Sequence, residues 1–167
     1  MVPLVYVVEI EMPKGKLPGF YAQFVHKIGE QVKVIDRDKK LMIVSTEDDQ
    51  QQLLQIAAKY QAETECFSMW LLPEGVTCPR LSDYGFISLH DRQYVYANLV
   101  SFFRFSDNPL TLDHQEAYEQ MEQYILVSFT AKDQTIYIVD TNHKELLDQL
   151  ASRYKVILDW HPGIPSA

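Results

Sequence analysis

Two stretches of this sequence follow one pattern: IYIVDTNHKELLDQLASRY, residues 136–154, repeats the order of LMIVSTEDDQQQLLQIAAKY, residues 41–60. In each stretch, an apolar strand ends in Ile-Val. A Ser or an Asp comes next and is followed by Thr, and a polar turn then leads into an amphipathic helix that ends at a Tyr. Apolar residues three and four apart line one face of each helix. The matching pairs are Leu53 and Leu147, Ile56 and Leu150, Ala57 and Ala151, and Tyr60 and Tyr154. The repeat predicts an internally duplicated fold.

The first copy extends to a β-α-β-β-α-β order within residues 1–72. β-branched and aromatic residues favour strands, and Pro13 and Pro73 mark where two of the strands stop. Thr46 is the expected N-cap of the second helix, and Gly29 is expected to end the first. The strands are expected at residues 4–12, 31–36, 41–46 and 64–72, and the helices at 20–30 and 47–60. This order is the split βαβ, or ferredoxin-like, arrangement.

The same order is expected again in the second copy, residues 94–167. Corresponding positions are 95 residues apart before the turn and 94 residues apart after it. The strands are expected at residues 94–106, 124–130, 135–141 and 155–160, and the helices at 112–123 and 142–154. The sequence therefore predicts an α+β protein of two tandem ferredoxin-like halves related by internal duplication, in which antiparallel sheets carry helices on one face.

Residues 73–93 connect the two halves and have no counterpart in either copy. Part of this segment, YGFISL at residues 84–89, is expected to pair with the following strand across the turn HDRQ, residues 90–93. A connection of this length is either a plain crossing between the halves or a functional segment.

The composition is globular, and the second half is acidic. Of the 167 residues, 47% are hydrophobic and 23% are charged, and the net charge is −8. Residues 81–167 hold six basic and twelve acidic side chains, so we expect neither duplex nucleic acid nor an anionic membrane as a partner, whereas a basic protein is compatible with this charge. No apolar run reaches the roughly 20 residues that span a bilayer, and the first residues lack the features of a signal peptide. We therefore expect a cytoplasmic protein.

The sequence contains no recognised motif for catalysis or metal binding. Cys66 and Cys78 do not have the spacing of a zinc site. His114 and Glu116 are two residues apart, whereas ligands on one helix face lie three or four apart. The nucleophile elbow, the P-loop and the dinucleotide-binding fingerprint are missing. The sequence thus predicts no metal, no cofactor and no catalytic residue.

The stretch VYVVEIEMPKGKLPGFYAQFVHKIGEQVKVIDRDKKLMIV, residues 5–44, resembles an ACT domain, a small regulatory module that binds amino acids and similar ligands. The resemblance covers residues 4–60 and includes a strand, a loop that ends in Pro-Gly, a helix and a hairpin. It implies a ligand site in the loop formed by Gly15, Lys16, Leu17, Pro18 and Gly19, where backbone N–H groups at a helix start suit a carboxylate. Lys16-Leu17 stands where the family usually has an acidic residue. The second half has SDNPLTLD, residues 106–113, and no Pro-Gly.

Two functions from different classes fit this sequence. The first is a non-enzymatic regulatory or protein-interaction module, whose duplicated scaffold presents a groove or a sheet edge to a protein partner, a second copy or a small ligand. The alternative is a small enzyme of the tandem dimeric α+β barrel type, with a pocket between sheet and helices. The polar residues that such an enzyme would use are His90, Arg92, Arg104 and His114.

The aromatic strand SFFRF, residues 101–105, raises RNA binding as a third function to consider. Exposed aromatic residues on a ferredoxin-like sheet are typical of RNA binding by base stacking. The basic and glycine residues that precede such a strand in RNA-recognition domains are missing here, and the acidic balance opposes binding to RNA. We therefore expect Phe103 and Phe105 to pack in the core.

Overall fold

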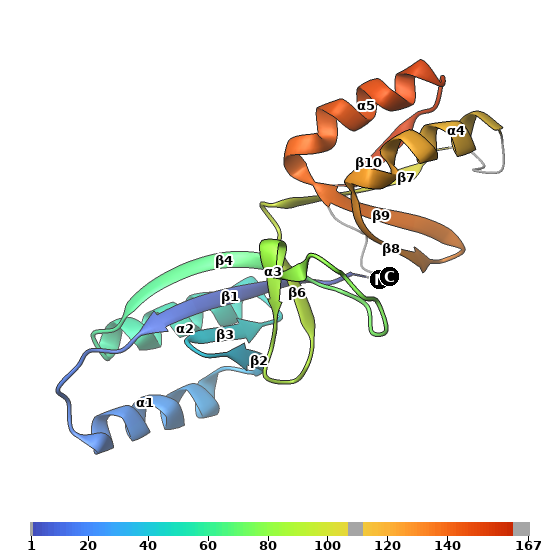
Figure 1. The fold of residues 1–167 in the computed structure, drawn as a ribbon. Coiled ribbons are helices and arrows are strands. Elements are labelled where there is room, and N and C mark those ends of the chain that lie inside the picture. Colours follow the sequence, from blue (N-terminus) through green and yellow to red (C-terminus); the bar gives the residue numbers. More distant parts are fainter. Residues whose placement is uncertain (1, 107–111, 162–167) are drawn as a thin grey trace. The chain divides into compact units, whose positions relative to one another are not determined.

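The structure is a computed structural model that describes residues 2–106 and 112–161. Within these ranges the chain forms ten β-strands and five α-helices (Figure 1). The strands form two sheets of antiparallel pairs, against which the longer helices pack. The predicted α+β class with antiparallel sheets is therefore confirmed.

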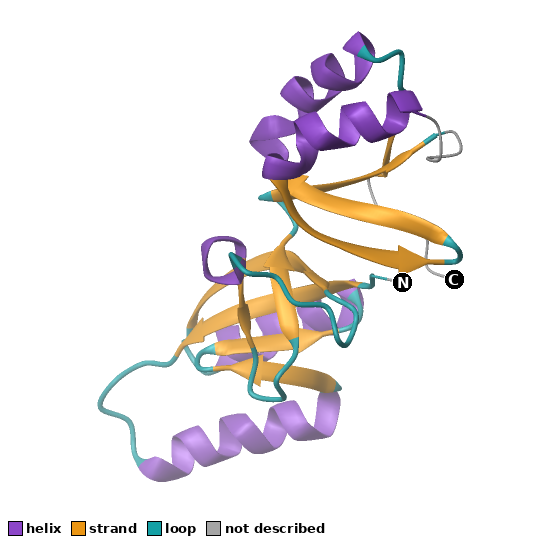
Figure 2. Ribbon diagram, turned by 45° about the vertical axis from the view of Figure 1, so that its right-hand side comes forward, coloured by secondary structure: helices purple, strands orange, loops and turns teal. Residues whose placement is uncertain are grey.

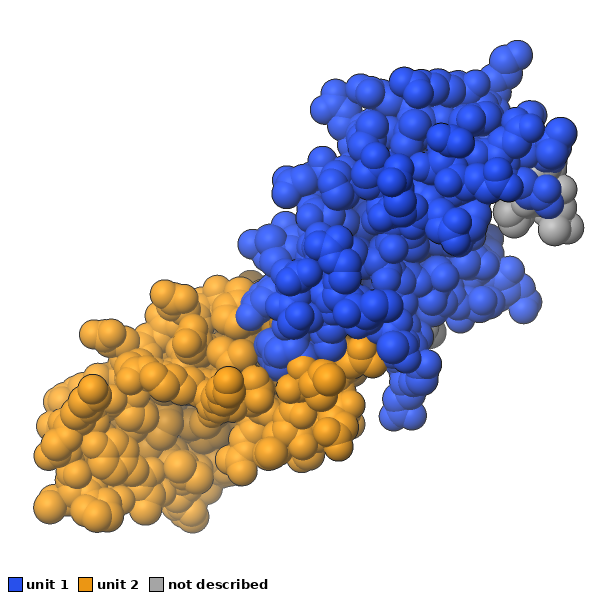
Figure 3. Space-filling view, viewed as in Figure 1, with its two compact units in different colours: residues 1–3, 72–86, 95–167 blue, residues 4–71, 87–94 orange. Residues whose placement is uncertain are grey.

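The chain divides into two compact units, which Figure 3 shows in different colours. Unit 2 comprises residues 4–71 and 87–94, and unit 1 comprises residues 1–3, 72–86 and 95–167. The predicted connecting segment, residues 73–93, is thus shared between the units, because its first part packs with unit 1 and its last part packs with unit 2.

Unit 2 is built around the first four strands and the first two helices. These are β1 (Leu4–Glu11), α1 (Pro18–Gln31), β2 (Val34–Asp38), β3 (Leu41–Val44), α2 (Glu47–Lys59) and β4 (Glu63–Leu71). The strands lie in the order β2-β3-β1-β4, and two further strands, β6 (Gln93–Tyr96) and β5 (Gly85–Ile87), follow β4 in the same sheet. Figure 2 shows α1 and α2 on the same side of the sheet, so one apolar layer serves both helices.

The core of unit 2 follows from helix spacing and strand alternation. Its buried members are Val8, Ile10, Phe24, Ile28, Val32, Val44, Leu53, Ile56 and Ala57. At the start of α2, the Thr46 hydroxyl accepts a hydrogen bond from the backbone N–H of Asp49 at 3.1 Å, which confirms the predicted cap. Gly29 does not end α1, which continues to Gln31 because Val32 enters the core and donates its N–H to Ile28 at 2.9 Å.

Unit 1 repeats this order of elements. It contains β7 (Val100–Phe105), α4 (Leu112–Met121), β8 (Ile125–Ala131), β9 (Gln134–Asp140), α5 (Lys144–Arg153) and β10 (Leu158–His161), with 3-10 turns η1 (Glu122–Tyr124) and η2 (Thr141–His143). The strand order is β10-β7-β9-β8. The buried core consists of Phe103, Ala117, Met121, Val139, Leu147, Ala151, Val156 and Leu158. The predicted core position of Phe103 is confirmed, whereas Phe105 is only partly buried.

The segment before β7 departs from the prediction. A single strand at residues 94–106 is wrong, because a turn at residues 97–99 separates β6 from β7. In this turn the N–H of Leu99 donates to the carbonyl of Tyr96 at 3.1 Å, and the two strands belong to different sheets. The predicted pairing of YGFISL with the following strand is confirmed, since β5, which follows the short helix α3 (Leu81–Tyr84), lies beside β6.

Two sequence features remain to be placed. SDNPLTLD, which contains no Pro-Gly, falls mainly on residues 107–111, outside the described residues. In the part of the chain that the structure covers, none of the helices combines the length and the apolar character needed to cross a membrane.

The buried leucines of the two repeated helices should contribute alike to stability. Leu53 and Leu147 both have no exposed surface, so Leu53→Ala and Leu147→Ala should each lower the free energy of unfolding by about 2–5 kcal/mol in urea titrations. Leu150→Ala should cost less than Ile56→Ala, because Leu150 is half-buried. Leu146→Ala, at a partly exposed position of the same helix, is the control. A loss under about 0.5 kcal/mol at Leu147 would contradict the equivalence of α2 and α5.

Candidate functional site

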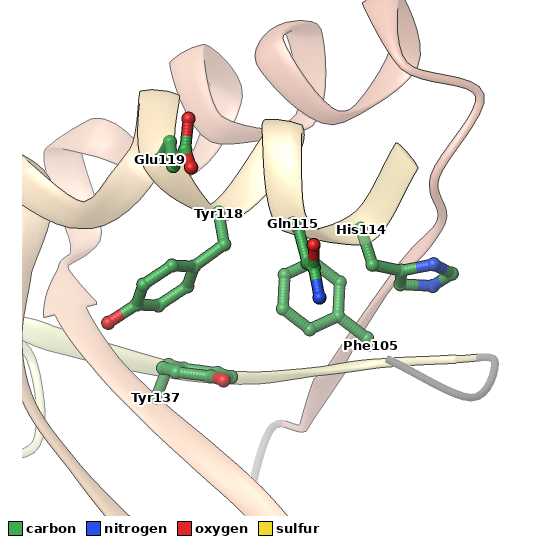
Figure 4. A pocket seen from close by; sticks show the side chains of 6 residues that line it. All are labelled: Phe105, His114, Gln115, Tyr118, Glu119 and Tyr137. Carbon is green, nitrogen blue, oxygen red and sulfur yellow. The ribbon is translucent and has the colours of Figure 1, made fainter. Parts of the chain in front are cut away.

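A groove of about 370 Å³ lies between α4 and the sheet of unit 1. It is lined by Phe105, His114, Gln115, Tyr118, Glu119 and Tyr137. Figure 4 shows the rings of Tyr118 and Tyr137 in the space between the helix and the strands, with Glu119 higher on α4. The groove therefore has aromatic walls and one carboxylate among its lining residues.

The local sequence explains how these side chains come together. Gln115, Tyr118 and Glu119 lie at i, i+3 and i+4, so they share one flank of α4. Strand alternation puts Phe103 and Phe105 on the same face of β7. Tyr137 of β9 is the register partner of Phe103, and the two rings stack at 5.1 Å between centroids. The stacked core pair fixes one wall of the groove.

The aromatic rings of the groove contact one another mainly through edges and tilted faces. The Tyr137 centroid lies 5.6 Å from that of Phe105 and 5.8 Å from that of Tyr118. Phe105 also contacts the buried His114 ring edge-on at 5.3 Å. Burial and the nearby Tyr118 raise the pKa of Tyr137, so its hydroxyl is protonated and neutral at physiological pH.

The electrostatic environment of the groove is negative. Asp113, Glu116, Glu119 and Glu122 follow one another at intervals of three residues along α4 and into η1, and all four are exposed. Residues 112–124 contain no lysine and no arginine. Among the described residues, no basic side chain forms an ion pair with any of the four carboxylates. Of the four, Glu119 lines the groove, which is thus suited to a cation rather than to an anion.

A second polar cluster surrounds a buried carboxylate in unit 2. Asp36 of β2 is 1% exposed. Its Oδ2 accepts hydrogen bonds from the Ser88 hydroxyl and, at 2.9 Å, from the Tyr94 hydroxyl. Its Oδ1 accepts from the Arg37 N–H at 2.8 Å and lies 3.1 Å from Nδ1 of the exposed His90. Two of these donors, and His90, come from residues 88–94, so the carboxylate attaches this segment to β2.

The backbone strengthens the same attachment. The N–H of Leu89 donates to the carbonyl of Arg37 at 2.9 Å, so the turn between β5 and β6 reaches β2, at the opposite end of the strand order. The Ser88 N–H donates to the carbonyl of Arg92 at 2.9 Å, and the Arg92 N–H donates to the Ser88 hydroxyl at 3.2 Å, which closes the turn itself. The sheet of unit 2 is therefore curled, and its two ends are hydrogen-bonded.

Burial shifts the pKa of Asp36 in one direction, and the neighbouring donors and charge shift it in the other. Burial alone would raise its pKa, but the hydrogen bonds from Ser88, Arg37 and Tyr94 and the nearby His90 outweigh burial and lower the pKa. For Tyr94, burial and the hydrogen bond to Asp36 raise the pKa to about 12. At neutral pH the pair is an ionised carboxylate and a neutral phenol.

Unit 1 contains a similar pair. The Tyr84 hydroxyl donates to Asp140 Oδ2 at 2.7 Å, and the Asn142 N–H donates to Asp140 Oδ1 at 2.8 Å. Burial tends to raise the pKa of Asp140, yet the bonds from Tyr84 and Asn142, with His143 and Arg80, lower it. Tyr84 thus anchors the first part of the connecting segment to the end of β9.

The loop implied by the ACT-like resemblance, Gly15 to Gly19, is tied to α1. The Tyr21 hydroxyl donates to the carbonyl of Pro13 at 2.6 Å and accepts from the Lys16 N–H at 3.3 Å. Gly15 has φ +78°, in the left-handed region that favours glycine. Leu17 precedes α1 as an exposed N-cap without a side-chain hydrogen bond, and Pro18 has no N–H to offer. Ligand binding at this loop stays a prediction.

The four residues of the enzyme alternative are divided between the units. His90 and Arg92 lie in unit 2, beside Asp36 and Ser88, whereas Arg104 and His114 lie in unit 1. Arg104 of β7 pairs with Asp159 of β10 at 2.7 Å and donates to Gln134. Only His114 lines the groove.

Sequence reasoning missed Asp36, Tyr94, Tyr118 and Tyr137 as members of polar or ligand-accessible sites. The one signal for the groove was the i, i+3, i+4 spacing of Gln115, Tyr118 and Glu119. In the described ranges, no three His, Cys, Asp or Glu side chains are grouped as a metal ion would require. Comparison of the sequence with protein-family models and with curated proteins finds no match.

Removing the Asp36 carboxylate should destabilise unit 2, because it leaves two buried hydroxyls without their acceptor. Asp36→Ala should lower the free energy of unfolding by about 2–5 kcal/mol at pH 7. Asp38→Ala, two residues further along β2, should change it by less than about 1 kcal/mol. Urea unfolding of both variants measures the difference, and equal losses would contradict the role given to Asp36.

The same cluster predicts how stability depends on pH. The pKa of Asp36 is lower in the folded state than in the unfolded state. Its contribution to the free energy of unfolding is therefore present above the unfolded pKa of about 3.9, and it is lost as the pH falls through the folded pKa. The pKa of Tyr94 is raised to about 12 in the folded state. Its contribution to the free energy of unfolding is therefore present below the unfolded pKa, and it is lost as the pH rises to about 12. Tyr94→Phe should flatten the alkaline part of the stability profile, measured by urea unfolding between pH 8 and pH 12. An unchanged profile would show that Tyr94 titrates alike in both states.

Proposed function

We propose that this protein is a non-enzymatic regulatory or protein-interaction module, and that the groove beside α4 is where it binds. The observation that carries this proposal is the groove itself, in which Tyr118 and Tyr137 face a common space. Binding sites are concave and mostly apolar, with a few polar groups that orient the ligand. Here Gln115 and Glu119 are the polar groups that would orient it.

The arrangement around Ser88 supports binding rather than catalysis. A serine nucleophile needs a base that takes its proton, usually an imidazole. Here the Ser88 hydroxyl donates to Asp36, and His90 lies beside the other oxygen of the same carboxylate. A buried carboxylate with a lowered pKa is a weak base, so this cluster holds the structure together and does not activate a nucleophile.

The fold proposed for this module is a pair of ferredoxin-like halves that arose by internal duplication. The support is the strand order, β4-β1-β3-β2 in unit 2 and β10-β7-β9-β8 in unit 1, together with the buried pairs Leu53 and Leu147, Ala57 and Ala151. The ACT-like character of the first half belongs to the same proposal. A regulatory module of this kind would act with a protein partner or a second copy, and we place it in the cytoplasm because both cysteines are free thiols.

Thermal-shift screening of the full chain against amino acids, amines, nucleotides and common cofactors tests the proposal. A ligand at a hundredfold its dissociation constant adds about 2.7 kcal/mol of stability. The shift should disappear in Tyr118→Ala, which removes one wall of the groove, and persist in Gly15→Ala, which strains the loop of the ACT-like prediction. If the shift persists in Tyr118→Ala and disappears in Gly15→Ala, the loop is the binding site and the groove is not. A shift that survives both substitutions would contradict both sites.

A further inference from the structure

We propose that the groove beside α4 receives an arginine side chain from a basic segment of a partner protein. This inference rests on the proposed function and adds the chemical class of what is bound. It follows from the aromatic walls and the carboxylates beside the groove in unit 1, and from the negative charge of residues 81–167.

The aromatic walls suit a flat cation. A guanidinium group is attracted to the faces of tyrosine rings and stacks on them. Tyr118 and Tyr137 contact each other at an inclination of 49°, with centroids 5.8 Å apart, and both rings line the groove. Tyr137 also keeps its hydroxyl protonated, which leaves an oxygen that can accept a hydrogen bond from a guanidinium N–H. The arginine stem would lie along Phe105.

The carboxylates determine the sign of the ligand. Glu119 is the acidic residue of the lining, and Glu122 lies one helical step further on the same flank. A carboxylate and a guanidinium can form two parallel hydrogen bonds. No lysine or arginine occurs in residues 112–124 to compete for these positions. An anionic ligand such as a phosphate would be repelled by the Glu119 carboxylate here.

The carboxylates beside the groove favour a protein segment over a small molecule. Glu119 lines the groove, whereas Glu122, one helical step further on the same flank, lies outside the lining. A ligand that contacts both carboxylates must continue beyond the groove, as a peptide with further basic residues does. The net charge of −6 in residues 81–167 would attract such a segment over a longer distance.

Fluorescence anisotropy with the full chain tests this inference. The probe is a labelled peptide with two arginines separated by three glycines, and its neutral counterpart has citrulline in place of both arginines. The arginine peptide should bind at 50 mM salt, and the citrulline peptide should bind at least about tenfold more weakly, because citrulline keeps the shape and loses the charge. Equal affinity of the two peptides would overturn the inference.

Variants then connect binding to the groove. Glu119→Gln and Tyr118→Ala should each weaken the arginine peptide at least about fivefold, whereas Glu145→Gln, an equal loss of charge at an exposed position of α5, should have little effect. Equal weakening by Glu145→Gln would mean unspecific attraction by the acidic surface and would overturn the assignment. Far-ultraviolet circular dichroism and melting of each variant confirm that it is folded. Glu119 is exposed, so its substitution leaves the core intact.

Three further outcomes distinguish a failure of the arginine assignment from a failure of the groove as the binding site. If free arginine binds as tightly as the peptide, the occupant is a small molecule and the partner segment is wrong. If the peptide fails to bind while another compound shows a thermal shift that Tyr118→Ala removes, the groove stays as the binding site and the cationic class is wrong. A compound whose shift survives Tyr118→Ala contradicts the groove itself.

Discussion

The buried carboxylate of Asp36 is the interaction on which the form of unit 2 depends. An ionised carboxylate with 1% exposure is costly unless its oxygens are hydrogen-bonded, and here Ser88, Tyr94 and the Arg37 N–H satisfy them. Two of these donors lie in a part of the chain that begins more than fifty residues later. The charge can be buried only when residues 88–94 are in place, so closure of the curled sheet and satisfaction of Asp36 are one event.

The connecting segment therefore has two structural tasks, one in each unit. Its first part supplies Tyr84 to Asp140 of unit 1, and its last part supplies Ser88 to Asp36 of unit 2, to which Tyr94, directly after the segment, also donates. Tyrosine suits both tasks, because its ring packs with apolar neighbours while its hydroxyl reaches a carboxylate. In both pairs the carboxylate pKa is lowered and the phenol pKa is raised, which is the expected signature of a phenol that donates to an ionised acid.

Much of the fold could be read from the sequence, and the exceptions have physical causes. Hairpins and amphipathic helices depend on local spacing, so the Thr46 cap and the buried faces of α2 and α5 were predictable. The break between β6 and β7 was not, because the turn at residues 97–99 contains neither glycine nor proline. Asp36 reads as a surface residue beside a polar turn, and its burial depends on a segment distant in sequence. The groove residues Phe105, Tyr118 and Tyr137 likewise come from three separate elements, so their proximity is a property of the tertiary structure.

A difference between the two units suggests why a groove is found beside α4. The helix α1 buries Phe24 and Ile28, whereas α4 buries His114, Ala117 and Met121, so Ala117 and Met121 repeat the four-residue spacing of α1. In unit 2 the Phe24 ring fills the layer above β1 and contacts Tyr60 at 5.3 Å between centroids. Ala117 fills much less of the corresponding layer, and closely packed interiors do not leave such volume empty. In unit 1 the larger side chains of Phe105, Tyr118 and Tyr137 partly replace the missing ring, and the space that they border is the groove. If the two units share an origin, an exchange of buried volume between equivalent helices accounts for the groove in unit 1.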